Sequence, residues 1–363
     1  MHNKISKRKV EELFPQLQPR FALYGTEPIG QPSGMGLVWK ARDTWLEKYV
    51  AIKISDQDLT PEIQLCHDIE GQTVRVYEYF RGQGDWNGFV MELLETPWCN
   101  LSKYISAHKY KENDLQHCFD CFEIAKSLLK GLKHIHGRPY SREGRYVHAD
   151  IKPDNLFVLL KPKKFKNTVF RMPIHDDVVK IIDLGITTEN GNRIKGKTFS
   201  YAHPTLQVAR HGNDLYSLAI VFLEMLMGEQ PDHDDLTSKK GVQKILNHYA
   251  SGSSYIDNIV LEFTNSCVRA ATQPNITASK LIDYLDDKLF EVESSYLLAL
   301  KAINELDEGA RKGDIADILF ESLADLYGWQ RTSENRRSIL KGIIEEMYGQ
   351  NMLVRRSQTY FVR

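Results

Sequence analysis

The spacing of apolar residues changes near Leu101, and this change limits the architecture more than any other feature. Before it, from Phe21 to Tyr79 and beyond, short β-branched and aromatic runs alternate with glycine and proline, which predicts strands. After it, apolar residues recur every three or four positions, as from Asn113 to His136, which predicts buried helices. Within this helical part, short strands are expected at Tyr146–Leu160 and Val178–Asp183. The pattern predicts an α+β protein with a small strand-rich lobe followed by a larger helical lobe.

The same patterns divide the chain into four parts. Residues 1–20 are charged and mixed and are expected to form a short helix or a loose arm, residues 21–94 the small lobe, and residues 95–290 the large lobe. One helix is expected in the small lobe, from Thr60 to Ile69, with Thr60 as its N-cap. Residues 291–363 are expected to form a separate domain, in which two helical patterns precede MLVRRSQTYFVR, a predicted hairpin. That order resembles a winged helix.

Composition excludes several classes of protein. Hydrophobic residues make up 42% and charged residues 26%, which is typical of a globular chain and excludes collagen, coiled coil and disorder. Without a run of about 18 apolar residues or an apolar secretory signal core, we expect no membrane contact. Five cysteines are too few for a disulfide framework, so we expect a cytoplasmic location. The net charge of −1 provides no overall attraction to nucleic acid.

The strongest motif is the loop His148-Ala149-Asp150-Ile151-Lys152-Pro153-Asp154-Asn155. Its spacing suits Asp150 as a base at a hydroxyl, Lys152 as a cation at a transferring phosphoryl group, and Asn155 as a metal ligand. A second motif, Lys180-Ile181-Ile182-Asp183-Leu184-Gly185, predicts a strand that ends in a carboxylate and a glycine. The oxygen ligand of Asp183 there suits Mg²⁺.

Two weaker motifs precede this loop. The segment Ile29-Gly30-Gln31-Pro32-Ser33-Gly34-Met35-Gly36-Leu37-Val38 places glycines between two predicted strands, where backbone N–H groups can approach phosphates closely. The run Val50-Ala51-Ile52-Lys53 ends in a lysine that could hold phosphate oxygens. Alone, the first motif is more often an ordinary glycine-rich hairpin, and the second is more often an exposed strand lysine.

The four motifs in this order resemble the signature of the protein kinases, and Lys152-Pro153 resembles the serine/threonine kinase loop. The stretch Ser33-Gly34-Met35-Gly36-Leu37-Val38 resembles that of the eukaryotic-like kinases of bacteria. The resemblance extends from about Phe21 to Phe290. It implies a bilobal protein-kinase-like fold, ATP and Mg²⁺ as cofactors, and transfer of a phosphoryl group to Ser/Thr hydroxyls of a protein substrate.

The resemblance also implies roles for individual residues. Lys53 would contact the α- and β-phosphates and pair with Glu62, and Thr198 would contact Asp150 and Lys152. Asn155 and Asp183 would hold the metal. The nucleotide-binding residues would be a gatekeeper (Met91), the hinge (Glu92 to Leu94), the residues that enclose the base (Val38, Ala51 and Phe157) and the glycine-rich segment (Gly30, Ser33, Gly34 and Gly36).

The chain departs from the kinase pattern before the catalytic aspartate. The usual arginine is Ala149, which implies a non-RD kinase, and the segment from Asp183 to Pro204 is short. A phosphate on that segment would lack its main receiver, so we expect activity without activation-segment phosphorylation. Two insertions, at 137–145 and 160–177, lengthen the large lobe, and the second is basic.

Two alternatives to an active protein kinase stay open. One is a pseudokinase that acts as a scaffold, against which the presence of Lys53, Asp150, Asn155 and Asp183 argues. The other is a small-molecule phosphotransferase, against which Lys152-Pro153 argues. The C-terminal domain could contact a protein or a nucleic acid, because basic residues gather around its second predicted helix and its hairpin: Arg331, Arg336, Arg337, Lys341, Arg355 and Arg356.

Overall fold

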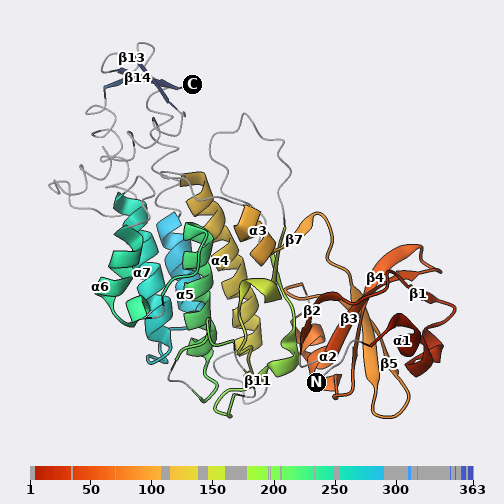
Figure 1. The fold of residues 1–363 in the computed structure, drawn as a ribbon. Coiled ribbons are helices and arrows are strands. Elements are labelled where there is room, and N and C mark those ends of the chain that lie inside the picture. The colour runs from red at the N-terminus through yellow and green to blue at the C-terminus, as the bar shows by residue number, and fades with distance from the viewer. Residues whose placement is uncertain are drawn as a thin grey trace. The chain divides into compact units, whose positions relative to one another are not determined.

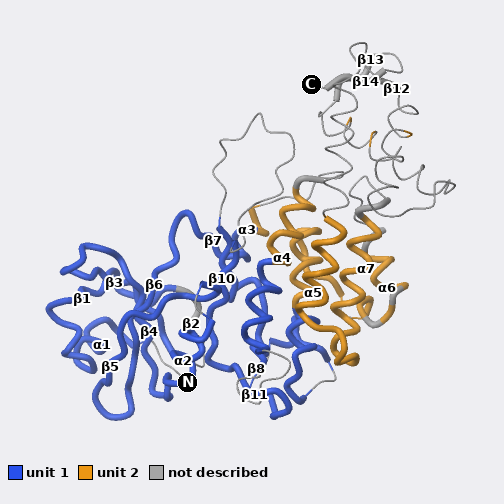
Figure 2. The backbone as a smooth tube through the Cα atoms, turned by 180° about the vertical axis from the view of Figure 1, so that it is seen from behind, with its two compact units in different colours: residues 1–104, 127–161, 177–217 blue, residues 105–126, 162–176, 218–363 orange. Residues whose placement is uncertain are grey.

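The computed structural model describes residues 5–33, 36–69, 71–107, 115–137, 146–159, 178–194, 196, 198–204, 207–232, 234–247 and 254–289, with short pieces at 310–311, 317, 344, 348, 353–356 and 359–362. The chain divides into two compact units, coloured in Figure 2. The first contains residues 1–104, 127–161 and 177–217, and the second contains residues 105–126, 162–176 and 218–363. Among the described helices, none has the length and apolar character needed to cross a bilayer.

An antiparallel sheet forms the N-terminal part of the first unit (Figure 1). Its strands follow the order β1 (Phe21–Leu23), β3 (Gly36–Asp43), β4 (Lys48–Ser55), β6 (Asn87–Glu92) and β5 (Val76–Arg81), and β2 (Ile29–Ser33) pairs with β3. The register places Val38 opposite Lys53, and Ala51 opposite Met91. The strand-rich small lobe expected from the sequence is confirmed.

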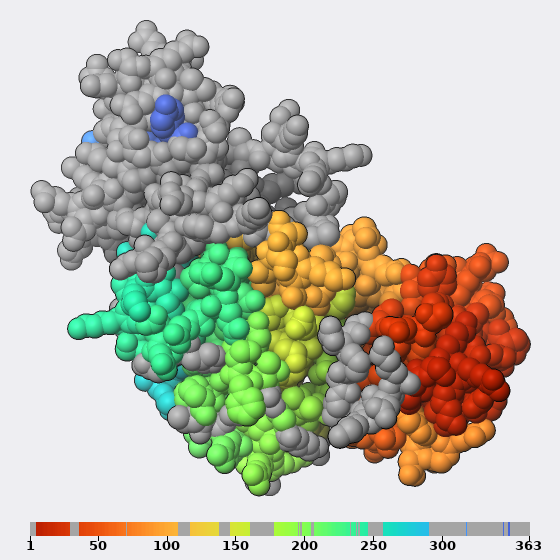
Figure 3. All heavy atoms as spheres, viewed as in Figure 1, coloured from red at the N-terminus to blue at the C-terminus, as the bar shows by residue number. Residues whose placement is uncertain are grey.

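The N-terminal segment packs on this sheet. Helix α1 (Lys7–Leu13) begins after Ser6, whose hydroxyl accepts from the backbone of Lys9, and the 3-10 turn η1 (Pro15–Leu17) follows. Val10 and Phe14 are fully buried in one core with Trp39 and Ile52. In the space-filling view the red residues of the N-terminal part of the chain form one continuous mass (Figure 3). Of the two alternatives expected for residues 1–20, the short helix is therefore present at Lys7–Leu13, and residues 7–17 are not a loose arm, because their apolar side chains complete the core of the sheet.

Helix α2 (Thr60–Asp68) lies between β4 and β5 in the chain, close to the expected bounds. Its N-cap is Leu59 rather than Thr60, and no side chain caps it at that position. Instead, Asp58 accepts a hydrogen bond from the Thr60 backbone at 2.9 Å. The predicted N-cap was wrong by one residue, and the helix buries Glu62, Leu65 and Cys66.

Short strands complete the first unit. Strand β9 (Leu156–Leu159) lies between β7 (Trp98–Asn100) and β10 (Val179–Ile181), and β8 (Tyr146–Val147) pairs with β11 (Thr188–Glu189). Two 3-10 turns, η2 (Pro153–Asn155) and η3 (Leu184–Ile186), follow the loop after β8 and the strand β10. These pairings hold the two motif-bearing loops in one unit.

Helices dominate the part of the second unit that the structure describes, as the sequence predicts. Helices α4 (Leu115–His136) and α5 (His211–Met227) pass through both units, and α3 (Leu101–Ala107) begins in the first unit. The turn η4 (Asp234–Thr237), α6 (Lys239–Asn247), α7 (Ser254–Ala270) and helical residues 278–289 belong to the second unit alone. Phe122, Phe222 and Phe263 form its aromatic centre, with ring centroids 5.0–6.3 Å apart.

Near the C-terminus, three short strands pair in the order β12 (Ala310–Arg311), β14 (Thr359–Val362) and β13 (Leu353–Arg356). The antiparallel pairing of β13 with β14 confirms the predicted hairpin. The two helices expected at 315–327 and 333–348 lie almost entirely outside the described residues. The insertion at 160–177 also lies outside them, as does the insertion at 137–145 except for Gly137.

Candidate active site

The structure brings Lys53 and Glu62 together in a buried ion pair. The Lys53 ammonium on β4 donates to both carboxylate oxygens of Glu62 on α2, at 2.7 and 2.8 Å. It also donates to Asp183 Oδ1 at 3.1 Å, although 130 positions separate the two residues in the chain. The side chains of Lys53 and Glu62 are only 5% and 6% exposed. One cation therefore links the sheet, helix α2 and the loop that follows β10.

Burial and charge act in opposite directions on this group of side chains. Burial lowers the pKa of the Lys53 ammonium, but the carboxylates of Glu62 and Asp183 outweigh it, and the pKa is raised. Burial raises the pKa of the Glu62 carboxyl, and Lys53 opposes that rise. We take the pair as ionised, because the ammonium donates to both oxygens of the Glu62 carboxylate.

The loop after β8 gathers four polar groups around Asp150. Asp150 Oδ1 accepts from the Thr198 hydroxyl at 2.6 Å and from the Thr198 backbone at 3.2 Å. Asp150 Oδ2 lies 2.7 Å from the Lys152 ammonium and accepts from the Asn155 amide at 3.0 Å. Lys152 also donates to Thr198 Oγ1 at 2.9 Å. The contact expected from Thr198 to Asp150 and Lys152 is present.

These contacts set the charge of Asp150. Burial acts to raise the pKa of its carboxyl, but the hydrogen bonds from Lys152 and Thr198 outweigh burial, and the pKa is lowered. The carboxylate is therefore ionised at neutral pH. An ionised carboxylate with several donors can accept a proton from, or orient, an incoming hydroxyl.

Asp214 on α5 fixes the backbone before Asp150. Its carboxylate is fully buried and accepts from the backbone N–H groups of His148 and Ala149 at 2.9 and 2.8 Å. It also contacts His136 Nε2 at 2.9 Å. Ala149 adopts φ +67°, a left-handed conformation that is costly for a residue with a Cβ. The two hydrogen bonds hold Ala149 in this conformation.

The glycine-rich segment forms the β2–β3 hairpin. Gly30 and Ser33 lie on β2, and Gly34 lies outside the described residues. Gly36 adopts φ +127°, and a Cβ there would lie 2.3 Å from the Ile54 carbonyl oxygen. Only glycine fits this close approach of two strands.

The residues expected to enclose the base lie on the strands next to Lys53. Ala51 is buried on β4 and pairs with Met91, the last residue but one of β6. Val38 pairs with Lys53 on the neighbouring strand. Glu92 and Leu94, at and after the end of β6, are partly buried, and so is Phe157 on β9. Their contact with a nucleotide stays a prediction.

The two residues expected to hold a metal ion, Asn155 and Asp183, carry side-chain oxygens that could bind one. The Asp183 carboxylate is 26% exposed. The Asp183 backbone adopts φ +58° directly before η3, two residues after the end of β10. The Asn155 amide nitrogen donates to Asp150. A carboxylate oxygen and an amide oxygen are the ligand types that Mg²⁺ prefers. Within the described ranges, no site has three or more histidine, cysteine or acidic ligands for a metal.

One contact of this region was not predicted from the sequence. Lys180 on β10 forms an ion pair with Glu92 at the end of β6. The two residues are 88 positions apart, and neither stands out in its motif. Sequence spacing alone offers no signal for such a pair.

Comparison with known proteins identifies similar chains. The family model described as "Protein kinase domain" matches residues 26–294. A probable serine/threonine-protein kinase of Clostridium acetobutylicum is 24% identical over 316 residues, which cover 82% of this chain and 43% of that protein. Serine/threonine-protein kinase A of Synechocystis is 28% identical over 238 residues, which cover 59% of this chain and 42% of that protein. The chain thus spans less than half the length of these relatives.

Proposed function

The chain belongs to the protein kinase family, and from this premise we propose that it transfers the γ-phosphoryl group of ATP to serine or threonine hydroxyls of a protein substrate. The observation that carries the proposal is that two groups of side-chain contacts hold the expected catalytic residues in place. Lys53 joins Glu62 and Asp183, and Asp150 is held ready by Lys152, Asn155 and Thr198. Phosphoryl transfer needs mainly the positioning of the reacting groups and the neutralisation of phosphate charge, and these two groups of contacts supply both.

Each residue then has a distinct task. Lys53, fixed by Glu62, holds the α- and β-phosphates. Asp150 orients the acceptor hydroxyl and accepts its proton, and Lys152 neutralises charge on the transferring group. Asp183 and Asn155 would hold Mg²⁺, which when bound neutralises the phosphate oxygens.

We also propose that the kinase is of the non-RD type and is active without phosphorylation of its activation segment. Ala149 has no side-chain donor for a phosphate. Thr188 is only 4% exposed and pairs with Val147 between β11 and β8. The Thr187 hydroxyl is buried as well. The hydrogen bonds that Thr198 donates to Asp150 need no phosphate, so Thr198 is held at the site without one.

A triple alanine variant at Thr187, Thr188 and Ser200 tests this proposal after phosphatase treatment. We expect a phosphoryl-transfer rate within a few-fold of that of the wild type, if folding is preserved by circular dichroism. A loss of about a hundredfold, roughly 2.7 kcal/mol of transition-state stabilisation, would show that a phosphate on this segment is required. Ser200→Ala alone, the least buried of the three changes, decides the question if the triple variant does not fold.

The kinase activity itself is tested with ATP and a generic protein substrate. Wild-type chain should transfer phosphate, and Asp183→Asn should not, because the variant loses a metal-binding carboxylate. Binding of ATP without transfer by the wild type would support a pseudokinase scaffold. Transfer only to a small-molecule acceptor would support the small-molecule phosphotransferase. Neither outcome is expected. The presence of Lys53, Asp150, Asn155 and Asp183 argues against a pseudokinase, and Lys152, which contacts both Asp150 and Thr198, argues against a small-molecule phosphotransferase.

For residues 291–363 we propose a separate winged-helix-like domain that docks a protein or a nucleic acid. Its support is the β12–β14–β13 sheet, in which Arg355 and Arg356 lie on the hairpin strand β13. Removal of residues 295–363 should preserve ADP binding by the remainder, since the family match ends at residue 294. Loss of ADP binding would place the tail in the kinase core. Salt-dependent binding of duplex DNA by the full chain would favour nucleic acid over protein.

A further inference from the structure

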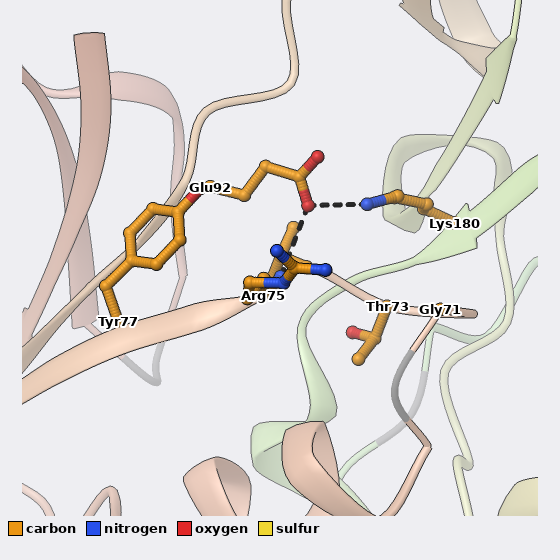
Figure 4. Close-up of a pocket in the computed structure, with 7 residues that line it drawn as sticks. Gly71, Thr73, Arg75, Tyr77, Glu92 and Lys180 are labelled. Atoms are coloured by element: carbon orange, nitrogen blue, oxygen red, sulfur yellow. Dashed lines mark hydrogen bonds and ion pairs between the residues drawn. The ribbon is translucent and has the colours of Figure 1, made fainter. Parts of the chain in front are cut away.

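The ion pair between Lys180 and Glu92 joins two strands that are distant in sequence. The Lys180 ammonium is directed at the Glu92 carboxylate, as Figure 4 shows. The two side chains are 13% and 27% exposed, and the ammonium lies 5.3 Å from the centroid of the Trp98 ring. Because both charges are largely removed from water, salt screens their attraction less than at an exposed pair. The Trp98 ring adds a cation–π contact.

Glu92 is fixed from a second direction by the backbone of Arg75. The Glu92 N–H donates to the Arg75 carbonyl at 2.8 Å. The Arg75 N–H donates to Glu92 Oε2 at 3.3 Å, and this is the same oxygen that Lys180 contacts. A single carboxylate oxygen therefore receives both a backbone donor and a lysine.

The strand of Lys180 leads to Asp183 within three residues, and its backbone is also fixed. The Ile181 N–H donates to the Gln72 carbonyl at 2.8 Å, and the Thr73 hydroxyl donates to the Ile181 carbonyl at 2.7 Å. The Ile182 N–H donates to the Asn155 carbonyl at 2.9 Å. Because these hydrogen bonds tie the end of β10 to Asn155 and to the residue before Asp183, a displacement of Glu92 relative to β10 also displaces it relative to Asn155 and Asp183, the two expected metal ligands.

A pocket of about 160 Å³ lies beside the ion pair and is lined by residues 71, 73–75 and 77 together with Glu92 and Lys180 (Figure 4). This space offers the Glu92 side chain room to move if its cation is removed. A carboxylate that loses its partner can turn toward water there instead of remaining desolvated. Loss of Lys180 should therefore change the position of Glu92 more than the stability of the unit.

We propose that Lys180 is a positioning residue for the nucleotide. Through Glu92 it fixes the first residue of the hinge in place against the strand that leads to Asp183. The inference rests on the proposed function, in which Glu92 to Leu94 offer backbone groups to adenine. Lys180 does not contact Asp150 or Lys152 in the described structure, so its removal should weaken nucleotide binding and leave the chemical step nearly intact.

The test measures the dissociation constant of Mg-ADP by calorimetry on the full chain, together with kcat and KM for ATP. Lys180→Met keeps the aliphatic stem on Trp98 and removes the charge. We expect a five- to tenfold increase in the dissociation constant and in KM, with kcat changed less than about threefold. Lys180→Arg retains a cation and should restore the dissociation constant to within twofold of that of the wild type.

Glu92→Gln removes the other charge of the pair and should weaken Mg-ADP binding by a similar factor. The double variant of Lys180→Met with Glu92→Gln should bind Mg-ADP no more weakly than either single variant, because each single change already removes the same ion pair. Lys244→Met is the matched control, because it breaks an exposed ion pair with Asp235. We expect this control to bind Mg-ADP as the wild type does.

The outcomes separate this inference from the function on which it rests. If the wild type binds no Mg-ADP, the proposed function fails. If the wild type binds but Lys180→Met binds equally well, only the role of Lys180 is refuted. Losses in the two single variants that add up in the double variant refute the coupling. If thermal unfolding shows that Lys180→Met is not folded, the nearly isosteric Glu92→Gln takes its place. Mg-ADP binding by Glu92→Gln equal to that of the wild type then refutes the role of Lys180.

Discussion

Replacing Lys53 with methionine should destabilise the protein in a way that depends on pH. The change removes the cation that lies 2.7 Å from Glu62, and the Glu62 side chain is only 6% exposed. A carboxylate that is left buried without its partner is strongly unfavourable, by about 3–5 kcal/mol in comparable pairs. Glu62 can avoid this cost by taking up a proton, which limits the loss.

The cost of protonating Glu62 sets the upper limit of the loss in stability. Protonating a carboxyl of ordinary pKa 4.5 at pH 7 costs about 3.4 kcal/mol, at about 1.36 kcal/mol per pH unit. Burial of the methionine side chain offsets part of this cost. We therefore expect Lys53→Met to lower the free energy of unfolding by about 2–3 kcal/mol at pH 7.

The sign of the pH dependence follows from the pKa of Glu62. Burial raises this pKa in the folded protein, and the variant lacks the lysine that opposes the rise. The folded variant then binds a proton that the unfolded chain releases at neutral pH, so stability increases as the pH falls. The deficit should shrink by up to about 2.7 kcal/mol between pH 7 and pH 5.

The assay is urea unfolding followed by tryptophan fluorescence, to which the fully buried Trp39 contributes. Equal m values show that the same transition is compared. The control is the double variant of Lys53→Met with Glu62→Met, which has no buried carboxyl at this position and should recover at least half of the loss. If the single and double variants are equally stable, with the same deficit at both pH values, the reasoning is refuted.

Three further outcomes follow from the structure. Asp150→Asn should lower kcat by at least a hundredfold and change KM for ATP less than threefold, because Asp150 serves the acceptor hydroxyl rather than the nucleotide; an unchanged kcat in steady-state assays contradicts its assignment. Since Lys152 and Thr198 lower the pKa of Asp150, its carboxylate stays ionised as the pH falls, and kcat at saturating Mg-ATP should be flat from pH 7 to about pH 5; a fall in kcat by half near pH 6 argues against this. Phe14→Ala should lower the free energy of unfolding in urea by about 3–5 kcal/mol, because Phe14 is fully buried and packs 5.3 Å from the Phe80 ring; a change below 1 kcal/mol would mean that the N-terminal helix is not part of the core.

The sequence by itself determined the elements and the local part of the site. Alternating and helical patterns of apolar residues predicted the sheet, α4 and the terminal hairpin, because these patterns depend on neighbours close in the chain. The loop from His148 to Asn155 was predicted for the same reason, since five residues span the distance from Asp150 to Asn155. The N-terminal helix also carried a signal, the three- and four-residue spacing of Val10, Leu13, Phe14 and Leu17, which the many charges around it obscured.

Only the tertiary structure decided which distant residues meet. Lys53 reaches Asp183 across 130 positions, and Lys180 reaches Glu92 across 88. Charged residues of either sign are common at strand ends, so no spacing marks these particular pairs. Strand register and the packing of α2 determine which charged residues pair, because they bring the two charges out of water together. A buried charge is stable only beside its counterion, and that condition is met in space rather than along the chain.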